Sequence, residues 1–341
     1  MKGRDLALLA IVLGIAGFAT FDALRGDDSS ARPSTTPRPE EATSAAPETV
    51  SIEPVDGLPQ GLLDGRLVYS EARTGCTVGV VDFESRTSFS VPGLRSTCAI
   101  VAAPAGGAVA FSLPSTRRDV LPYRVVDLDR PQFDVTSFEA LNGSVVWSAD
   151  GRRVAWCGRG RQGREIVLGR AERSLAGCPI GYAPNGSPAF VRGDEVFLAH
   201  GRSYKAQEPI SAAAFGRDGS LALLGPRGHV VVYSRERSVR TESAVLPGIS
   251  RLRVRFSPLN CSLTYMPEDV APRDVPVVPI RGCARSRRPR EFPGYAVAWS
   301  PDERWLAVAG DDGVAIWPAG GGPAVARIGV SAVDLAWTGA G

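Results

Sequence analysis

A short repeat recurs through most of the length of this chain and limits the folds that it can adopt. Each copy is an apolar run that ends in a large aromatic residue, followed by a turn rich in Ser, Pro, Asp and Gly and then by a second apolar run. The clearest copies span residues 145–152 and 297–304, and weaker ones span 182–186, 215–219 and 256–260. A copy at 102–106 lacks the aromatic residue. Because Asp, Asn and Gly favour tight hairpins, the repeat predicts many short strands joined by turns.

Further turns follow within the repeats, at residues 192–194, 226–228 and 311–313, and each precedes another apolar run. A strand–turn–strand–turn–strand unit of roughly 33 to 45 residues has the size of one four-stranded blade of a β-propeller. The sequence therefore predicts an all-β fold in which residues 58–341 form a single β-propeller. We expect seven blades, and six or eight stay open because the second unit is long and poorly marked.

The two ends of this region complement each other. Residues 333–339 have the pattern of the first strand of a repeat, after which the sequence stops. Residues 63–69 have the pattern of a turn and a second strand, with no first strand before them. We expect the N- and C-terminal strands to pair in one shared blade, because this closure leaves no sheet edge open.

The turn from Ser300 to Arg304, Ser-Pro-Asp-Glu-Arg, and the apolar run after it resemble WD40-like and TolB-like propeller repeats, here in a membrane-anchored protein of bacterial type. The same turn occurs in part at residues 148–152, and the resemblance covers most of residues 60–341. The Trp-Asp dipeptide of WD40 repeats is absent, and its Gly-His partner occurs once, at Gly228-His229. The resemblance implies a rigid disc that contacts other proteins.

The N-terminus carries an export signal. Lys2 and Arg4 precede an apolar run, and residues 6–24 are long enough to cross a tilted or locally thinned bilayer. The positive-inside rule leaves residues 1–5 in the cytoplasm and exports the rest of the chain, which predicts a single-pass membrane protein. The alternative is a signal peptide with Gly17 and Ala19 as a small-x-small site, which is cleaved before Thr20 and releases a secreted protein.

Residues 25–57 are rich in Ser, Thr, Pro, Ala and Glu and contain almost no large apolar side chains. Such a segment buries too little surface to offset the entropy of ordering. Its prolines favour extended conformations. We therefore expect a disordered tether between the membrane and the propeller.

Six cysteines fall into three consecutive pairs, with separations of 22, 21 and 22 positions. These pairs are Cys76 and Cys98, Cys157 and Cys178, and Cys261 and Cys283. In the predicted blades, both members of the first two pairs lie in loops on one face, and both members of the third lie in turns on the opposite face. We expect three sequential disulfides, as in an oxidising compartment. Reduced, buried cysteines are the main alternative, and a metal site lacks a C-x-x-C motif.

No sequence motif for catalysis was found. A Gly-x-Ser-x-Gly elbow, a zinc-protease motif, a P-loop and a dinucleotide fingerprint are all absent. The two histidines, His200 and His229, are expected at the surface. The sequence thus predicts a protein that is not an enzyme and needs no cofactor. The alternative is a metal-dependent propeller hydrolase or lactonase, or a ligand sensor, with its site in the central channel. The candidate acids for that site are Asp127, Asp129, Asp311 and Asp312.

Basic residues cluster at two places, and nearly all of them are arginine. The larger cluster is a candidate contact for an acidic partner or an anionic wall polymer, with a solvated loop as the alternative. It comprises Arg281, Arg285, Arg287, Arg288 and Arg290. The smaller comprises Arg159, Arg161 and Arg164. A net charge of +3 argues against a general nucleic-acid binder. We expect an extracytoplasmic scaffold, tethered to the cell membrane, that binds another protein or an envelope component.

Overall fold

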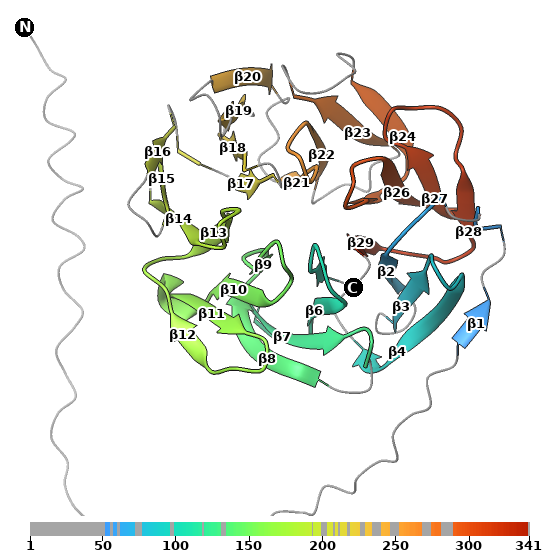
Figure 1. The fold of residues 1–341 in the computed structure, drawn as a ribbon, viewed down its shortest axis with the longest axis horizontal. Coiled ribbons are helices and arrows are strands. Elements are labelled where there is room, and N and C mark those ends of the chain that lie inside the picture. The colour runs from blue at the N-terminus through green and yellow to red at the C-terminus, as the bar shows by residue number, and fades with distance from the viewer. Residues whose placement is uncertain are drawn as a thin grey trace, which may run out of the picture. The chain divides into compact units, whose positions relative to one another are not determined.

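Seven antiparallel sheets stand around a common centre in the computed structural model (Figure 1). The structure describes residues 52–54, 57–59, 62–71, 77–95, 99–117, 119–130, 134–192, 194–198, 203–206, 209–210, 212–216, 219–225, 229–233, 240–245, 252–267, 274–280 and 289–339. All of these residues belong to one compact unit, 46–341. The predicted all-β propeller of seven blades is confirmed.

We name the blades A to G in chain order, with strands from the centre outward. Blade A contains β29 (Asp334–Thr338), β2 (Arg66–Glu71), β3 (Thr77–Asp82), β4 (Thr87–Arg95) and β1 (Ile52–Pro54). Blade B contains β5 (Ile100–Ala102), β6 (Ala108–Ser112), β7 (Val120–Asp127) and β8 (Asp134–Leu141). Blade C contains β9 (Val146–Trp147), β10 (Arg153–Cys157), β11 (Gly163–Val167) and β12 (Glu172–Ser174), with a short 3-10 helix at Arg159–Arg161.

The other four blades each contain four consecutive strands. Blade D contains β13 (Pro179–Tyr182), β14 (Pro188–Arg192), β15 (Glu195–Leu198) and β16 (Ser203–Lys205). Blade E contains β17 (Ala212–Phe215), β18 (Leu221–Leu224), β19 (His229–Tyr233) and β20 (Arg240–Val245). Blade F contains β21 (Leu252–Phe256), β22 (Ser262–Pro267), β23 (Asp274–Pro279) and β24 (Arg290–Pro293). Blade G contains β25 (Ala296–Trp299), β26 (Trp305–Gly310), β27 (Gly313–Pro318) and β28 (Ala326–Ile328).

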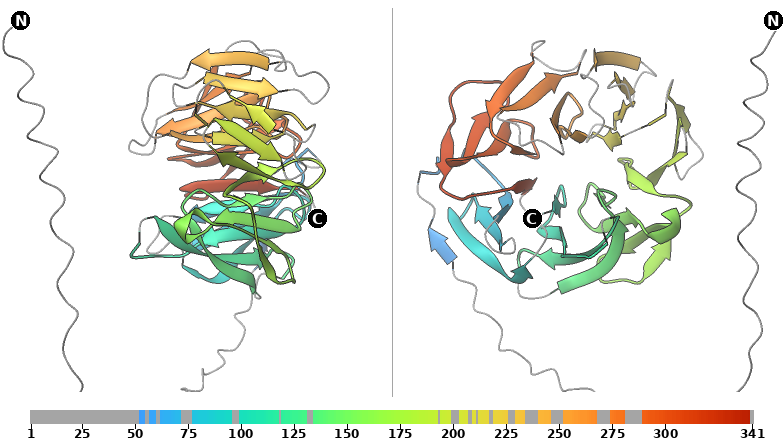
Figure 2. Two further views of the ribbon diagram at one scale, coloured as in Figure 1. Left: turned by 90° about the vertical axis from the view of Figure 1, so that its left-hand side faces the viewer. Right: turned by 180° about the vertical axis from the view of Figure 1, so that it is seen from behind.

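The strands run across the thickness of the ring, so the turns between them lie on its two faces (Figure 2). We call the face with the first-to-second and third-to-fourth strand turns the turn face. The second-to-third turns and the crossovers between blades lie on the opposite face. This division follows from the antiparallel order of each blade.

The ring closes as the two ends of the sequence predict. Strand β29 is the innermost strand of blade A and pairs with β2, in a register that sets Leu67 opposite Trp337 and Tyr69 opposite Leu335. The C-terminus lies at the inner side of the ring (Figure 1). Leu335 is fully buried, and Trp337 is almost so. Burial of these side chains therefore stabilises the closed ring.

Blade A has a fifth strand that the sequence did not predict. Residues 52–54, placed in the linker by composition, form β1 and pair with the outer edge of β4, with Ile52 opposite Phe89. Main-chain hydrogen bonds to an open sheet edge need no apolar side chains, which is why composition missed this strand. Pro54 is compatible with an edge strand, where one N–H is not needed. The sheet thus begins before residue 58.

Tryptophans that precede the repeat turns pack between their own blade and the preceding one. Trp147 packs with residues of blade B, Trp299 with residues of blade F, and Trp337 with residues of blade G. The Trp147 Nε1 donates to the carbonyl of Val101 at 2.9 Å, which joins blades C and B. These large side chains fill the wedge between neighbouring sheets.

Several sequence predictions fall on residues outside those described. They are the cytoplasmic residues 1–5, the membrane helix at 6–24, and the linker up to residue 51. Within the described part of the chain, no helix is long and apolar enough to span a bilayer. Membrane anchoring, export and signal cleavage stay predictions.

The middle cysteine pair forms the expected disulfide, Cys157–Cys178, with a Cα–Cα distance of 4.7 Å. It joins the end of β10 to the crossover that leads into β13. Both segments lie on the face opposite the turn face. Cys261 is half-buried in the β21–β22 turn, on the turn face as expected. Cys76, Cys98 and Cys283 lie outside the described residues, so the other two pairings stay predictions.

Candidate functional site

The repeat turn of blade G shows how the sequence pattern fixes the backbone of the turn face. The Ser300 Oγ accepts a hydrogen bond from the Trp305 N–H at 2.9 Å and donates to the Asp302 carboxylate at 2.6 Å. The same carboxylate oxygen accepts the N–H of Arg304 at 3.0 Å. Ser and Asp side chains thus replace water as partners of the turn backbone and hold the hairpin rigid.

Blade C repeats this arrangement. The Ser148 Oγ accepts the Arg153 N–H at 2.9 Å and donates to Asp150, whose carboxylate also accepts the Arg152 N–H at 3.1 Å. The hydrogen bond from Ser148 is the main cause that holds the pKa of Asp150 below its usual range, and the Arg152 N–H adds to it. Asp150 is therefore a fixed negative charge at neutral pH.

Blade B has the same backbone turn without its side chains. Ala103 N–H bonds to the Ala108 carbonyl at 2.9 Å, as Ser148 N–H bonds to Arg153 and Ser300 N–H to Trp305. The turns of blades C and G carry Ser, Asp and Arg at three positions. At the equivalent positions, blade B has Ala103, Ala105 and Gly107. Apart from Pro104, this turn contains only Ala and Gly, and a Cβ on Gly106 would meet no atom within 4 Å.

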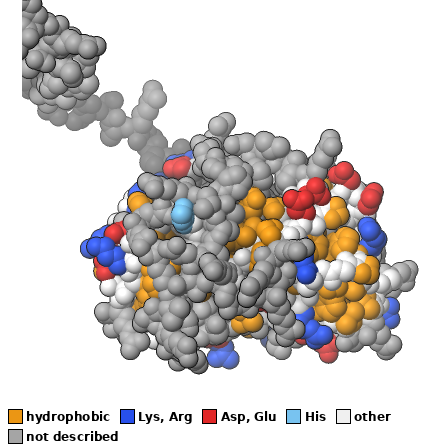
Figure 3. Space-filling view, turned by 90° about the horizontal axis from the view of Figure 1, so that it is seen from above, with side chains coloured by type: hydrophobic (Ala, Val, Ile, Leu, Met, Phe, Trp, Pro, Cys, Tyr) orange, Lys and Arg blue, Asp and Glu red, His pale blue; other side chains and the backbone are white. Residues whose placement is uncertain are grey.

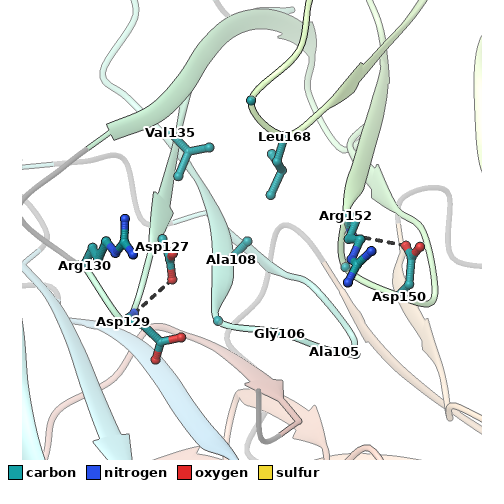
Figure 4. A pocket seen from close by; sticks show the side chains of 13 residues that line it. Ala105, Gly106, Ala108, Asp127, Asp129, Arg130, Val135, Asp150, Arg152 and Leu168 are labelled. Atoms are coloured by element: carbon teal, nitrogen blue, oxygen red, sulfur yellow. Dashed lines mark hydrogen bonds between the residues drawn. The ribbon is translucent and has the colours of Figure 1, made fainter.

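A cavity of about 940 Å³ opens at this place, on the turn face between blades B and C (Figure 4). Its lining comes from four turns, two in each blade. These residues are Ala105, Gly106, Gly107, Ala108, Asp127, Asp129, Arg130, Val135, Asp150, Gly151, Arg152, Leu168 and Gly169. In Figure 4, Asp127, Asp129 and Arg130 lie on one side and Asp150 and Arg152 on the other, with Val135 and Leu168 above them in the view. We refer to this cavity as the B/C pocket.

The candidate acids Asp127 and Asp129 line the B/C pocket and have separate roles. Asp127 accepts the Asp129 N–H at 3.0 Å, and Asp129 pairs with Arg66 of blade A at 2.7 Å. Arg66 also pairs with Asp82 at 2.9 Å. Burial alone would raise the pKa of Asp82, but hydrogen bonds from Ser85 and Arg66 outweigh it, and the pKa lies below its usual range. Arg66 thus ties blade A to blade B.

The structure does not bring all four candidate acids together. Asp311 and Asp312 are exposed in the β26–β27 turn, on the opposite face from Asp127 and Asp129. Among the residues that the structure describes, no group of three or more His, Cys, Asp or Glu side chains could hold a metal ion. The described residues therefore provide no metal site that would support the hydrolase or lactonase alternative.

An ion pair that the sequence analysis missed links the innermost strands. Arg255 of blade F donates to the Asp334 carboxylate of blade A at 2.7 Å and to the Val297 carbonyl of blade G, also at 2.7 Å. The second Asp334 oxygen accepts the Ile100 N–H of blade B at 3.0 Å. Four blades thus meet in one network. No sequence signal marks it, because the partners lie far apart along the chain.

A second missed group lies between blades C and D. Glu165, on the third strand of blade C, is fully buried. Its carboxylate accepts hydrogen bonds from the Tyr182 hydroxyl at 2.7 Å and from Arg173. Burial, with the Glu165 charge beside it, raises the pKa of Tyr182 strongly. The paired and hydrogen-bonded charge makes this a structural link between blades.

The two predicted arginine clusters have different outcomes. In the smaller, Arg159 pairs with Glu139 and Arg164 with Glu172, each at 3.2 Å, on exposed surfaces. In the larger, Arg290 donates to the Ala319 carbonyl at 3.5 Å, and residues 281–288 lie outside the described ones. On the rim seen in Figure 3, basic side chains of described residues occupy separate places rather than one patch. The anionic-partner contact stays a prediction.

No protein-family model matches the chain, and no curated protein sequence matches it. Among solved structures, a chain of the mitotic checkpoint complex is similar with a TM-score of 0.50, at 13% identity over 87% of this chain and 99% of that one. TolB from Acinetobacter baumannii is similar with a TM-score of 0.46, at 16% identity over 81% of this chain and 67% of that one. The Swd1 propeller domain of Myceliophteria thermophila has a TM-score of 0.45, at 16% identity over 67% of this chain and 84% of that one.

At such identities, these similarities concern the fold alone. With four-stranded blades and a closing blade shared by both ends of the domain, the chain is a seven-bladed β-propeller. The resemblance of the repeats to WD40-like and TolB-like propellers predicted this fold, and the fold is confirmed.

Proposed function

We propose that this protein is a non-enzymatic scaffold that works outside the cytoplasm and binds another protein or an envelope component through the turn face of its propeller. The observation that carries the proposal is the B/C pocket. It combines an apolar floor with charged walls, on turns held rigid by their own side chains. A rigid, concave surface that combines apolar and charged side chains is suited to binding another molecule.

The Cys157–Cys178 disulfide supports the location of the propeller. Disulfides persist in oxidising compartments and are rare in the cytosol. The apolar run at residues 6–24 and the composition of residues 25–51 support a membrane anchor and a tether. We infer a single-pass protein whose propeller faces the outside of the cell membrane.

A reporter fusion tests the location. An alkaline phosphatase that is active only outside the cytoplasm, fused after residue 341, is expected to be active and membrane-bound. Deletion of residues 1–24 is expected to abolish that activity. An inactive fusion on the full chain would contradict export, and an active fusion found in the medium would indicate signal cleavage.

Cross-linking in intact cells tests the scaffold function. A photo-reactive amino acid is placed at Ala105 in the B/C pocket and, as the matched control, at Asp312 on the opposite face. We expect a discrete cross-linked product from Ala105 and none from Asp312. A Ca²⁺ titration with a screen of lactones and esters tests the catalytic alternative, and stoichiometric metal with turnover would overturn the proposal.

A further inference from the structure

The sequence Asn-Gly-Ser occurs twice in the chain, and the two copies form a matched pair. One spans residues 142–144, in the crossover from β8 to β9, and the other spans residues 185–187, in the β13–β14 turn. Both asparagines are exposed, and the following glycine has a positive φ in each copy, 74° at Gly143 and 76° at Gly186. In such a sequence, the glycine nitrogen can reach the side-chain carbonyl carbon of the asparagine, because glycine has no Cβ to hinder the approach.

The turn at Asn185 holds both reacting groups. The Asn185 Oδ1 accepts the Ser187 N–H at 3.0 Å. The Gly186 N–H donates to the Ala183 carbonyl at 2.7 Å. Arg153 of blade C donates to the Gly186 carbonyl at 2.5 Å and packs so closely that a Cβ on Gly186 would overlap with it. At this copy, the amide and the nitrogen are kept apart by the fold.

The turn at Asn142 leaves both groups open. Within the described part of the chain, neither the Asn142 side chain nor the Gly143 N–H forms a hydrogen bond. A Cβ on Gly143 would meet no atom within 4 Å. The backbone on either side is fixed, because the Ser144 N–H donates to the Leu141 carbonyl at 3.0 Å and the Asn142 N–H donates to the Asp119 carbonyl at 3.0 Å. The exposed amide and nitrogen therefore lie side by side in water.

The third asparagine of the chain, Asn260, is fully buried. Its Nδ2 donates to the Ala214 carbonyl at 3.2 Å and to the Ser220 carbonyl at 3.1 Å. A buried and bonded amide is protected from attack, so Asn142 is the most accessible of the three asparagines to a neighbouring nucleophile.

We propose that Asn142 is a site of spontaneous deamidation. The Gly143 nitrogen loses its proton and attacks the side-chain carbonyl carbon of Asn142, the C–N bond of the carboxamide breaks, and ammonia leaves. The product is a succinimide ring. Water then opens the ring at either of its carbonyl groups, which gives aspartate or isoaspartate. Water is the only co-reactant, and no oxidant or reductant is consumed.

The modification changes both the charge and the backbone of the crossover between blades B and C. The net charge falls from +3 to +2, because one neutral amide becomes a carboxylate. Isoaspartate also adds one carbon atom to the main chain between Leu141 and Ser144. The Ser144 Oγ accepts the Cys157 N–H at 3.2 Å, so the crossover is tied to the end of β10 beside the disulfide. The site lies on the face opposite the turn face, and the inference is independent of the proposed function.

Peptide mapping by mass spectrometry tests the inference on the purified full chain after incubation at mildly alkaline pH. We expect an acid in place of the amide at Asn142, formed faster as the pH rises, because the attacking nitrogen must lose its proton. Reaction at Asn185 is expected to be at least about tenfold slower, since two hydrogen bonds must first break. Asn260 is expected to stay intact. Enzymatic methylation of the isoaspartyl carboxylate identifies the isoaspartate fraction.

Incubation of the same protein in urea is the matched control. Urea removes the surroundings of both turns and leaves the two Asn-Gly-Ser sequences unchanged, so similar rates at Asn142 and Asn185 are expected there. Two variants complete the test. Asn142→Gln moves the amide one carbon away from the nitrogen and is expected to abolish the reaction at this position, whereas Asn185→Gln is expected to leave the reaction at Asn142 unchanged. Thermal unfolding of both variants shows that the fold is retained.

Three results would overturn the inference. The first is an intact Asn142 in the folded protein under conditions in which the chain in urea reacts. The second is an equal rate at Asn142 and Asn185 in the folded protein, or a difference that persists in urea. The third is a glycan on Asn142 in protein isolated from its own host, because Asn-Gly-Ser is also an acceptor sequence for N-glycosylation and the amide would then be substituted.

Discussion

Arg255 and Asp334 form an ion pair of 2.7 Å between blades F and A, which are separated in the ring by blade G. The Asp334 side chain is 3% exposed and that of Arg255 is 24% exposed. Arg255 also donates to backbone carbonyls of Val297 and Leu335. One side chain thus holds the strand that closes the ring.

Replacement of this arginine should cost much stability. We expect Arg255→Met to lower the free energy of unfolding by about 3 kcal/mol, because the buried Asp334 carboxylate loses its ion pair with Arg255. Urea denaturation of the purified protein measures this. The control is Arg304→Met, since the pair of Arg304 with Asp302 is exposed and 3.8 Å long. Its expected cost is below about 0.5 kcal/mol, and equal costs for both variants would contradict the role of Arg255.

The disulfide should contribute a comparable amount. The Cys157–Cys178 bond closes a loop with a sequence separation of 21. In the chain-entropy model, its loss through Cys157→Ser with Cys178→Ser lowers the free energy of unfolding by about 3 kcal/mol. Denaturation with and without reductant measures the effect. Peptide mapping of the oxidised protein should recover this pair, and it also tests the predicted Cys76–Cys98 and Cys261–Cys283 bonds.

Two tryptophans at equivalent positions differ in one hydrogen bond, which gives a matched comparison. The Nε1 of Trp147 donates to Val101, whereas the Nε1 of Trp299 is buried with no partner among the described residues. Trp→Phe removes this donor at either site, together with similar apolar area. We therefore expect Trp147→Phe to cost about 1 kcal/mol more than Trp299→Phe. Chemical denaturation measures the loss of unfolding free energy in both variants. A larger loss for Trp299→Phe would show that the Trp299 N–H forms a hydrogen bond.

The phenol of Tyr182 should make the fold sensitive to alkali. Burial and the hydrogen bond to Glu165 raise its pKa in the folded state, whereas the unfolded chain ionises near the ordinary value of about 10. A raised folded pKa means that stability is full below the unfolded value and falls as pH rises beyond it. We expect this loss above about pH 10, measured by urea denaturation. In Tyr182→Phe, the slope should be shallower, and an unchanged slope would argue against the shift.

The architecture could be predicted from sequence because its signals are local. Ser148 with Asp150, and Ser300 with Asp302, form the bonds that their spacing within one turn predicts. Ring closure was also predictable, because residues 63–69 lack a first strand and residues 333–339 supply one. Pairing of these two segments leaves no sheet edge open. By contrast, β1 was missed because its pairing with β4 uses the main chain and has no apolar pattern.

The side-chain networks could not be predicted, since they depend on how blades are placed in space. Arg255 and Asp334 are 79 positions apart, and neither stands in a motif. The sequence around Glu165 does not indicate whether this side chain faces solvent or the neighbouring blade. The B/C pocket had a signal, namely the loss of the aromatic, Asp and Arg residues at 102–107, and it shows best when that turn is compared with the turns of blades C and G.

The shared blade also fixes an order of events for a nascent chain. Strands β1 to β4 emerge from the ribosome before the other described strands, and β29, which completes their sheet, emerges after all of these. Until then, the inner edge of β2 offers unpaired N–H and C=O groups beside Leu67 and Tyr69. Until β29 pairs with it, this edge can pair with strands of other molecules, so the formation of the β2–β29 ladder determines when the sheet is protected from aggregation.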